Sequence, residues 1–496
     1  MYSGEEWAAH HISRARSGGT DLPCHACTGR KSPHGSLRLR ADFRLALLSI
    51  ACLAAGASTV PALAQSNAQS ATARATRQQV EVGDAAEPEH ALGSWGGVRT
   101  RLSDAGIDLS PGYLAEIADV ASGGLRHGLD YAHQIKLQAD IDGDKLLGLG
   151  GFSLHTTLVE RAGRNASADY LGDDLFEVQE IYGGTKHAAA HLVYLYGEQL
   201  FAGGKLDLKA GRMDVGQDFA ASPLYCQFLS LGLCPQPRSL TLDSGFTIYP
   251  NSTWAARVRT QPGAVYLSLG VYQARPRYGG PSGFDWGFSH TTGVELPAEI
   301  GWEPRFGSAD LQGHYKAGIA INTSDTPDPL TGANYGHRFS WYLLADQMLA
   351  RTGKNGTDGM ILIGGWAHAD PRTAVLSDFA FGGVVARGVV PGRPGDTVEA
   401  LVSHGTISGR VTAAQRLAQA RDEPLPAGFP LSPGSFAAAA VPPGVQTGEW
   451  IVEANYGFKV RPGVTLVPDV QFVGRPAAVK TIPDALVLAG RLEVNF

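Results

Sequence analysis

Acidic and basic side chains lie close together in sequence in the middle of this chain, and together they could bind an uncharged, hydroxyl-rich solute. Carboxylates accept hydrogen bonds from hydroxyl groups, whereas Lys and Arg donate hydrogen bonds to them. An aromatic ring can cover the apolar C–H face of the same solute. The best candidates for this chemistry between positions 176 and 259 are Glu177, Glu180, Glu198, Lys209, Arg212, Asp214, Trp254 and Arg257.

The stretch 205–212 is predicted to be a strand that places only some of these charges on one face. Successive side chains of a strand point to opposite faces. Lys209 is therefore predicted to face a water-filled interior, whereas Arg212 has the phase of the apolar face unless the strand ends or bulges there. The apolar face consists of Leu206, Leu208 and Ala210.

Each candidate also has a plainer interpretation. Charges line the interior wall of a water-filled barrel without contacting any specific solute. Trp254 shares the phase of Ala256 and Val258, so a place in an interfacial aromatic girdle is as well supported as stacking on a solute.

Alternating strands indicate an all-β membrane protein. Residues 486–496 alternate strictly between an apolar and a polar row and end on Phe496. A lipid-facing apolar row beside a charged inner row, on a strand that closes the sheet, predicts an antiparallel up-and-down transmembrane β-barrel. Similar alternation recurs at 134–142, 152–158, 265–272 and 450–458, with Gly- and Pro-containing turns between the runs.

The N-terminus predicts export. Three arginines precede an apolar run over 45–60, and Ala62-Leu63-Ala64 gives a small-x-small cleavage pattern. Residues 1–64 are therefore expected to be an N-terminal extension and signal peptide, 65–91 a flexible mature N-terminus, and 92–496 the barrel. Cleavage after residue 64 of the 496 leaves 432 residues, which suit roughly sixteen strands.

Cys226 and Cys234 are the only cysteines after the predicted cleavage site. In an oxidising periplasm they are expected to form a disulfide in a small loop near the channel, with two free thiols as the alternative. If that loop folds inward, Arg212 and Asp214 at its base would lie beside the narrowest point. Arg491 of the last strand is expected to be a wall charge far from it.

Two further stretches bear on organisation. The segment 411–445 begins with a possible short helix at 412–420 and continues through Pro, Gly and a tetra-alanine run, so a long extracellular loop is expected. The segment Cys24-His25-Ala26-Cys27 has a metal-like spacing but lacks a second pair of ligands and precedes the cleavage site. No metal or cofactor is therefore predicted.

Several segments together resemble the carbohydrate-selective porin family, the OprB family. The resemblance begins at Leu92-Gly93-Ser94-Trp95-Gly96-Gly97 and covers essentially the whole chain from there. It implies a sixteen-stranded outer-membrane porin that passes sugars such as glucose by facilitated diffusion. The long N-terminal arm and the Ala- and Pro-rich expansion after Arg421 depart from the family pattern. The other matching segments are Gly123-Gly124, Gly211-Arg212, 219–226, 453–456, 468–471 and Pro476.

The predicted function is thus sugar diffusion through a mixed-charge constriction in the outer membrane of a Gram-negative bacterium. One alternative is a general or organic-solute diffusion porin without carbohydrate selectivity. A strongly anion-selective pore would need surplus Lys and Arg, but 47 acidic residues slightly outnumber 41 basic ones. The net charge of −6 does not indicate a nucleic-acid partner. The expected partners are carbohydrates and outer-membrane lipid, and a homo-oligomer is left open.

A barrel enzyme is the remaining alternative, and the sequence disfavours it. The chain lacks the Gly-x-Ser-x-Gly pattern of a nucleophile elbow. The adjacent pairs Ser289-His290 and Ser403-His404 cannot by themselves form a triad, because neighbouring residues of a strand point to opposite faces.

Overall fold

The structure is a computed structural model that describes residues 90–173, 175–181, 188–275, 282–352, 358–426 and 444–496. The predicted signal peptide at 1–64 lies outside the described residues. So does the predicted flexible segment 65–91, apart from its last two residues.

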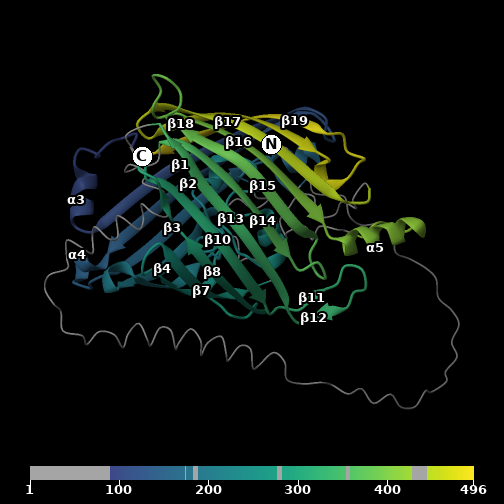
Figure 1. Cartoon of the computed structure of the whole chain (residues 1–496), viewed down its shortest axis with the longest axis horizontal. Coiled ribbons are helices and arrows are strands. Elements are labelled where there is room, and N and C mark those ends of the chain that lie inside the picture. Colours follow the sequence, from purple (N-terminus) through teal and green to yellow (C-terminus); the bar gives the residue numbers. More distant parts are fainter. Residues whose placement is uncertain (1–89, 174, 182–187, 276–281, 353–357, 427–443) are drawn as a thin grey trace, which may run out of the picture.

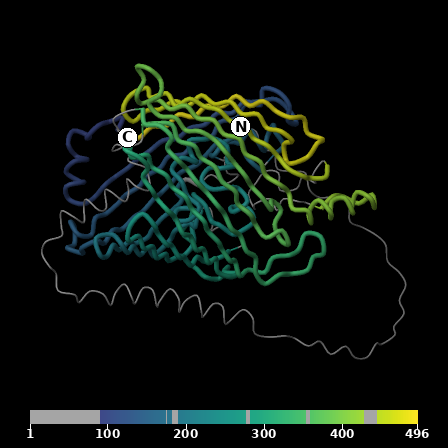
Figure 2. The backbone as a smooth tube through the Cα atoms, viewed as in Figure 1, coloured from purple at the N-terminus to yellow at the C-terminus, as the bar shows by residue number. Residues whose placement is uncertain are grey.

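Sixteen long strands of the described residues form a closed barrel (Figure 1). Each strand pairs antiparallel with its neighbours, and β1 closes the barrel by pairing with β19, with Tyr113 opposite Val494. Figure 2 shows the yellow C-terminal strands returning to the blue N-terminal part. The strands are β1 Ile107–Ser122, β2 Gly128–Asp142, β3 Phe152–Gly163, β4 Ala188–Phe201, β5 Leu206–Met213, β6 Thr253–Thr260, β7 Val265–Ala274, β8 Gly293–Trp302, β10 Leu311–Asn322, β13 Arg338–Arg351, β14 Gly359–Ala369, β15 Leu376–Arg387, β16 Thr397–Ile407, β17 Gly448–Arg461, β18 Val464–Gly474 and β19 Ala485–Asn495. The predicted barrel of about sixteen strands is confirmed.

Short elements lie at the two ends of this barrel and in its interior. The α-helices are α3 Val98–Asp104, α4 Gly143–Leu147 and α5 Gly409–Ala420; the short strands are β9 Arg305–Phe306, β11 Thr326–Pro327 and β12 Asn334–Tyr335; the 3-10 and π turns are η1 Ser167–Leu171, η2 Ala202–Gly204, η3 Tyr225–Gln227, η4 Leu240–Ser244 and η5 Pro476–Ala478.

The two ends differ in the length of their connections. Helices α3 and α4 lie at the end with the shorter turns, whereas α5 and the β11–β12 hairpin lie at the opposite end (Figure 1). Outer-membrane barrels have short periplasmic turns and longer extracellular loops. This places α5, which begins the predicted loop 411–445, at the extracellular end. Helix α5 confirms the helix predicted at 412–420, while 427–443 lie outside the described residues.

Alternation along each strand separates a lipid-facing row from a lumen-facing row. In β19, Leu486 and Leu488 are 39% and 50% exposed, whereas the side chain of Arg491 is buried inside the barrel. In β2, Ile135 is exposed and its neighbour Gln134 is buried. Among the described residues, none of the helices is both long enough and apolar enough to cross a membrane.

Candidate functional site

Residues 214–252, here called the constriction loop, connect β5 to β6 and cross the barrel interior. The loop leaves the β5 wall and reaches side chains of β17 and β19 on the other side. Two residues of the loop, Cys226 and Cys234, form a disulfide, as predicted. The prediction that this small loop lies near the channel agrees with the same contacts.

Wall side chains hold the tip of the constriction loop through its backbone. Arg491 donates to the carbonyl oxygens of Cys226 at 3.0 Å and Gln227 at 3.3 Å. The Glu453 carboxylate accepts from the Leu229 amide at 2.5 Å. Arg491 therefore contacts the loop directly, and the expectation that it lies far from the loop was wrong. The reason is that the loop spans the lumen instead of staying beside its own wall.

Charged side chains hold the base of the same loop. Asp218 accepts from Lys209 at 2.9 Å, from Arg257 at 3.0 Å and from the Tyr272 hydroxyl at 3.2 Å. Arg257 also pairs with Asp207 at 2.7 Å. Burial raises the pKa of Asp218, but the charges of Lys209 and Arg257 outweigh burial and lower this pKa to about 2. The Asp218 carboxyl therefore stays ionised.

Glu198 joins this group from β4. It lies opposite Lys209 in the β4–β5 register and accepts from His155 at 3.1 Å. His155 also contacts Asp140 at 2.6 Å and stacks on the Tyr196 ring with centroids 4.8 Å apart. The structure thus brings together three of the predicted residues, Glu198, Lys209 and Arg257.

Glu177 and Glu180 lie on a different segment inside the barrel. Glu177 accepts from Asn165 at 2.9 Å and lies 3.4 Å from Arg238 of the constriction loop. Glu180 lies 3.9 Å from Arg161 of β3. These two acids therefore support a second inward segment through Arg238 and Arg161.

Asp214 begins the constriction loop, as expected for a residue at its base. Its carboxylate accepts from the Tyr194 hydroxyl and, at 2.5 Å, from the Gln217 amide. Despite these donors, burial raises the pKa of Asp214 to about 7.

Arg212 lies outside the lumen group. It keeps the phase of the outward row of β5, and a segment between β7 and β8 folds over it. Its guanidinium donates to the carbonyl oxygens of Asp285 at 2.8 Å, Ser252 at 3.0 Å and Gly283 at 3.3 Å. Arg212 therefore contacts the end of the constriction loop from the outward row of β5 and lies apart from the Lys209 group, as strand parity indicated. Its role toward a solute stays a prediction.

Trp254 lies next to Arg212 in the β5–β6 register. Its indole N–H donates to the Trp286 carbonyl at 3.1 Å, and its ring stacks on Phe288 with centroids 6.2 Å apart. Like Arg212, it has the phase of the outward row and lies apart from the Lys209 group. Of the two roles left open for Trp254, this position fits the aromatic girdle.

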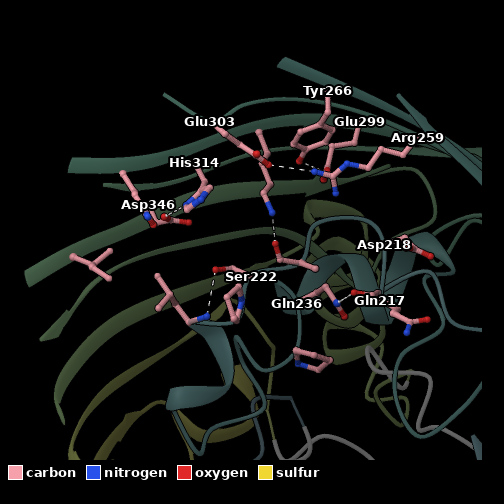
Figure 3. A pocket seen from close by; sticks show the side chains of 18 of the residues that line it. Gln217, Asp218, Ser222, Gln236, Arg259, Tyr266, Glu299, Glu303, His314 and Asp346 are labelled. Carbon is pink, nitrogen blue, oxygen red and sulfur yellow. Dashed lines mark hydrogen bonds and ion pairs between the residues drawn. The ribbon is translucent and has the colours of Figure 1, made fainter. Parts of the chain in front are cut away.

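A cavity of about 310 Å³ lies between the constriction loop and the facing wall (Figure 3). Acidic and basic side chains line it in pairs: Arg259 lies 3.2 Å from Glu303, and His314 lies 2.5 Å from Asp346. Arg259 also covers the Tyr266 ring at 3.9 Å. The polar lining is completed by Gln217, Asp218, Ser222, Gln236, Glu299, Gln312, Lys316 and Arg387.

Sequence reasoning missed this cavity and part of the base group. Asp207 shares the phase of Lys209, so parity alone could have placed it in the lumen. Asp218 follows the strand in an irregular segment, where no periodicity marks it. The cavity residues on β6 to β15 occupy inward positions, but nothing in their local sequence separates them from ordinary wall charges.

Comparison with known proteins gives the family. A family model described as "Carbohydrate-selective porin, OprB family" matches residues 126–496. This chain belongs to the OprB family. It is an outer-membrane porin of the Gram-negative type, with a β-barrel architecture shared by its structural neighbours.

Individual relatives cover most of the chain. Porin B of Pseudomonas aeruginosa (strain PAO1) is 28% identical over 430 residues, which cover 82% of this chain and 91% of that protein. The putative porin QuiX of Acinetobacter baylyi (strain ADP1) is 26% identical over 418 residues, covering 82% and 92%. A high-pH structure of Pseudomonas putida OprB superposes with a TM-score of 0.74 at 27% identity, covering 83% of this chain and 99% of that one.

Proposed function

We propose that this OprB-family porin passes neutral carbohydrates such as glucose along the cavity between the constriction loop and the facing wall. The observation that carries the proposal is the pairing of charges there. Each paired group keeps hydrogen-bonding capacity for hydroxyls, while its partner limits the net field that would attract ions. The chain acts as a channel rather than as an enzyme.

The residues that line the cavity and the predicted residues around it take distinct roles in this proposal. Asp218 lines the cavity, and Lys209 and Arg257 hold it from behind. Tyr266 offers a ring for the apolar face of a sugar, although Arg259 covers one side of it. Glu198 orders the neighbouring wall through His155. Glu177, Glu180 and Asp214 position the inward segments.

The test is single-channel conductance of the purified protein in a planar bilayer, titrated with glucose and with a disaccharide. We expect saturable, dose-dependent closure of the ion current by glucose. A current that falls only in proportion to solution viscosity, equally for both sugars, would identify a general diffusion porin instead.

A further inference from the structure

We propose that Glu299, together with Tyr266, Tyr342 and Lys316, forms a clamp that fixes one bend of the constriction loop and thereby sets the width of the pore. The bend lies at Ala220. The proposal rests on the channel function proposed above, but it does not require that the channel recognise sugar.

Glu299 of β8 is the centre of the clamp. One carboxylate oxygen, Oε2, accepts from the Ala220 amide at 2.9 Å and from the Tyr342 hydroxyl at 2.7 Å. The other, Oε1, accepts from the Tyr266 hydroxyl at 2.7 Å. All three side chains are buried. Glu299 and Tyr266 lie together at the upper edge of the cavity in Figure 3.

Two glycines allow the tyrosines to reach this carboxylate. A Cβ at Gly301 would lie 2.1 Å from the Tyr266 ring, and a Cβ at Gly318 would lie 2.1 Å from the Tyr342 ring. Both rings therefore lie against wall positions that have no side chain. Four neighbouring strands, β7, β8, β10 and β13, thus shape one site around Glu299.

The loop has a strained backbone where the clamp holds it. Ala220 has a φ of 55°, a left-handed conformation that residues with a Cβ rarely adopt. Glu299 binds the amide on one side of this residue, and Lys316 of β10 donates to the Ala221 carbonyl at 2.5 Å on the other. Such a conformation persists only where surrounding contacts determine it.

The clamp lies where the loop and the wall approach each other. Ala221, Ser222, Glu299 and Lys316 all line the cavity. Release of the bend would let Ala220 return to an ordinary backbone conformation and move this part of the loop, so the free cross-section beside it would change. The clamp is therefore a positioning device, and its residues act on the pore through the loop.

The test compares single-channel salt conductance of the wild-type protein with that of a Tyr266→Phe/Tyr342→Phe double variant. The substitutions remove two hydroxyl donors but change no charge and keep both rings. A hydrogen bond to a carboxylate is strong enough that losing one shifts an equilibrium by about tenfold or more. We expect excursions to a different conductance level to become about a hundred times more frequent.

Tyr315→Phe is the matched control. Its hydroxyl donates to Gln347 at 2.7 Å, on the outward row of β10, so the current should match wild type. Lys316→Met should act in the same direction as the double variant. It also carries the test if the double variant does not insert, which heat-modifiable electrophoretic mobility would reveal.

The outcomes separate this proposal from the proposed function. Clamp variants that insert normally and keep wild-type conductance and current noise overturn the clamp, whatever sugars do. Absence of glucose block in the wild-type channel overturns the sugar function but leaves the clamp, since the clamp is measured in salt alone.

Discussion

The base and the tip of the constriction loop are held in different ways. At the base, Asp218 pairs with two cationic side chains, Lys209 and Arg257, which are 9 and 39 residues away from it in sequence. At the tip, Arg491 and Glu453 bind backbone groups more than 200 residues away from them. The base therefore fixes which charges face the cavity. The contacts at the tip fix where the loop lies. They bind backbone groups, so they would hold the loop with almost any side chains at its tip.

The strongest test of this comparison is Arg491→Met at the tip. The change removes the donor to two loop carbonyls, and each buried group left unpaired costs about 1–3 kcal/mol. We expect the tip to detach, salt conductance to rise, and the half-blocking glucose concentration to increase more than about tenfold. Planar-bilayer recordings measure both quantities.

Arg393→Met is the control for this variant. Arg393 pairs with Asp396 at 2.8 Å in the β15–β16 turn and covers the Phe458 ring, outside the lumen. Equal behaviour of the two variants would show that the tip contact does not hold the loop.

Lys209→Met sharpens the comparison at the base. Asp218 would keep Arg257 but lose one charged hydrogen bond, which is worth about 1.5–3 kcal/mol. We expect the half-blocking glucose concentration to rise about tenfold with little change in salt conductance, because the tip remains anchored. Lys145→Met, which removes a contact to the Ser103 carbonyl in a periplasmic turn, should leave sugar block unchanged. A large conductance increase in Lys209→Met would contradict the division between base and tip.

A Cys226→Ser/Cys234→Ser double variant should have a smaller effect on the channel. Closing so short a loop restricts the unfolded chain by only about 2–3 kcal/mol. Arg491 and Glu453 still bind the tip, so conductance should change less than in Arg491→Met. Thiol labelling of the unreduced, denatured wild-type protein should find no free thiol. Two labelled thiols per chain would refute the disulfide.

Local patterns explain why the barrel was predictable and much of the site was not. Alternation in β19 and β2 marks both faces of a strand within a few residues. The same alternation in 205–212 predicted that Arg212 has the outward phase. The pairing of Glu198 with Lys209 follows from adjacent strands. The contact of Arg491 with Cys226 does not, because it depends on how an irregular segment crosses the lumen. The clamp at Glu299 likewise draws on four strands and a loop bend, which no single window of sequence contains.

Asp214 gives the test with the smallest expected effect. It asks whether two carboxyls at the same loop base, Asp214 and Asp218, differ in pKa. Burial raises its pKa from an ordinary value near 3.8 to about 7, whereas Lys209 and Arg257 keep Asp218 ionised. The folded chain therefore binds the Asp214 proton more tightly than the unfolded chain does. Its contribution to stability is complete below about pH 3.8 and is lost as the pH rises through about 7.

The titration of Asp214 should also change the ion selectivity of the channel. Between pH 6 and pH 8 the loop base gains most of one negative charge, so the ratio of cation to anion permeability should rise slightly, as measured by reversal potentials in a salt gradient. Asp214→Asn should reduce that step, and the difference from wild type isolates this group from the rest of the channel. Asp218→Asn should lower the ratio at both pH values and leave the step in place. If Asp214→Asn keeps the full step, the Asp214 carboxyl does not titrate between pH 6 and pH 8, and burial at the loop base does not set its pKa near 7.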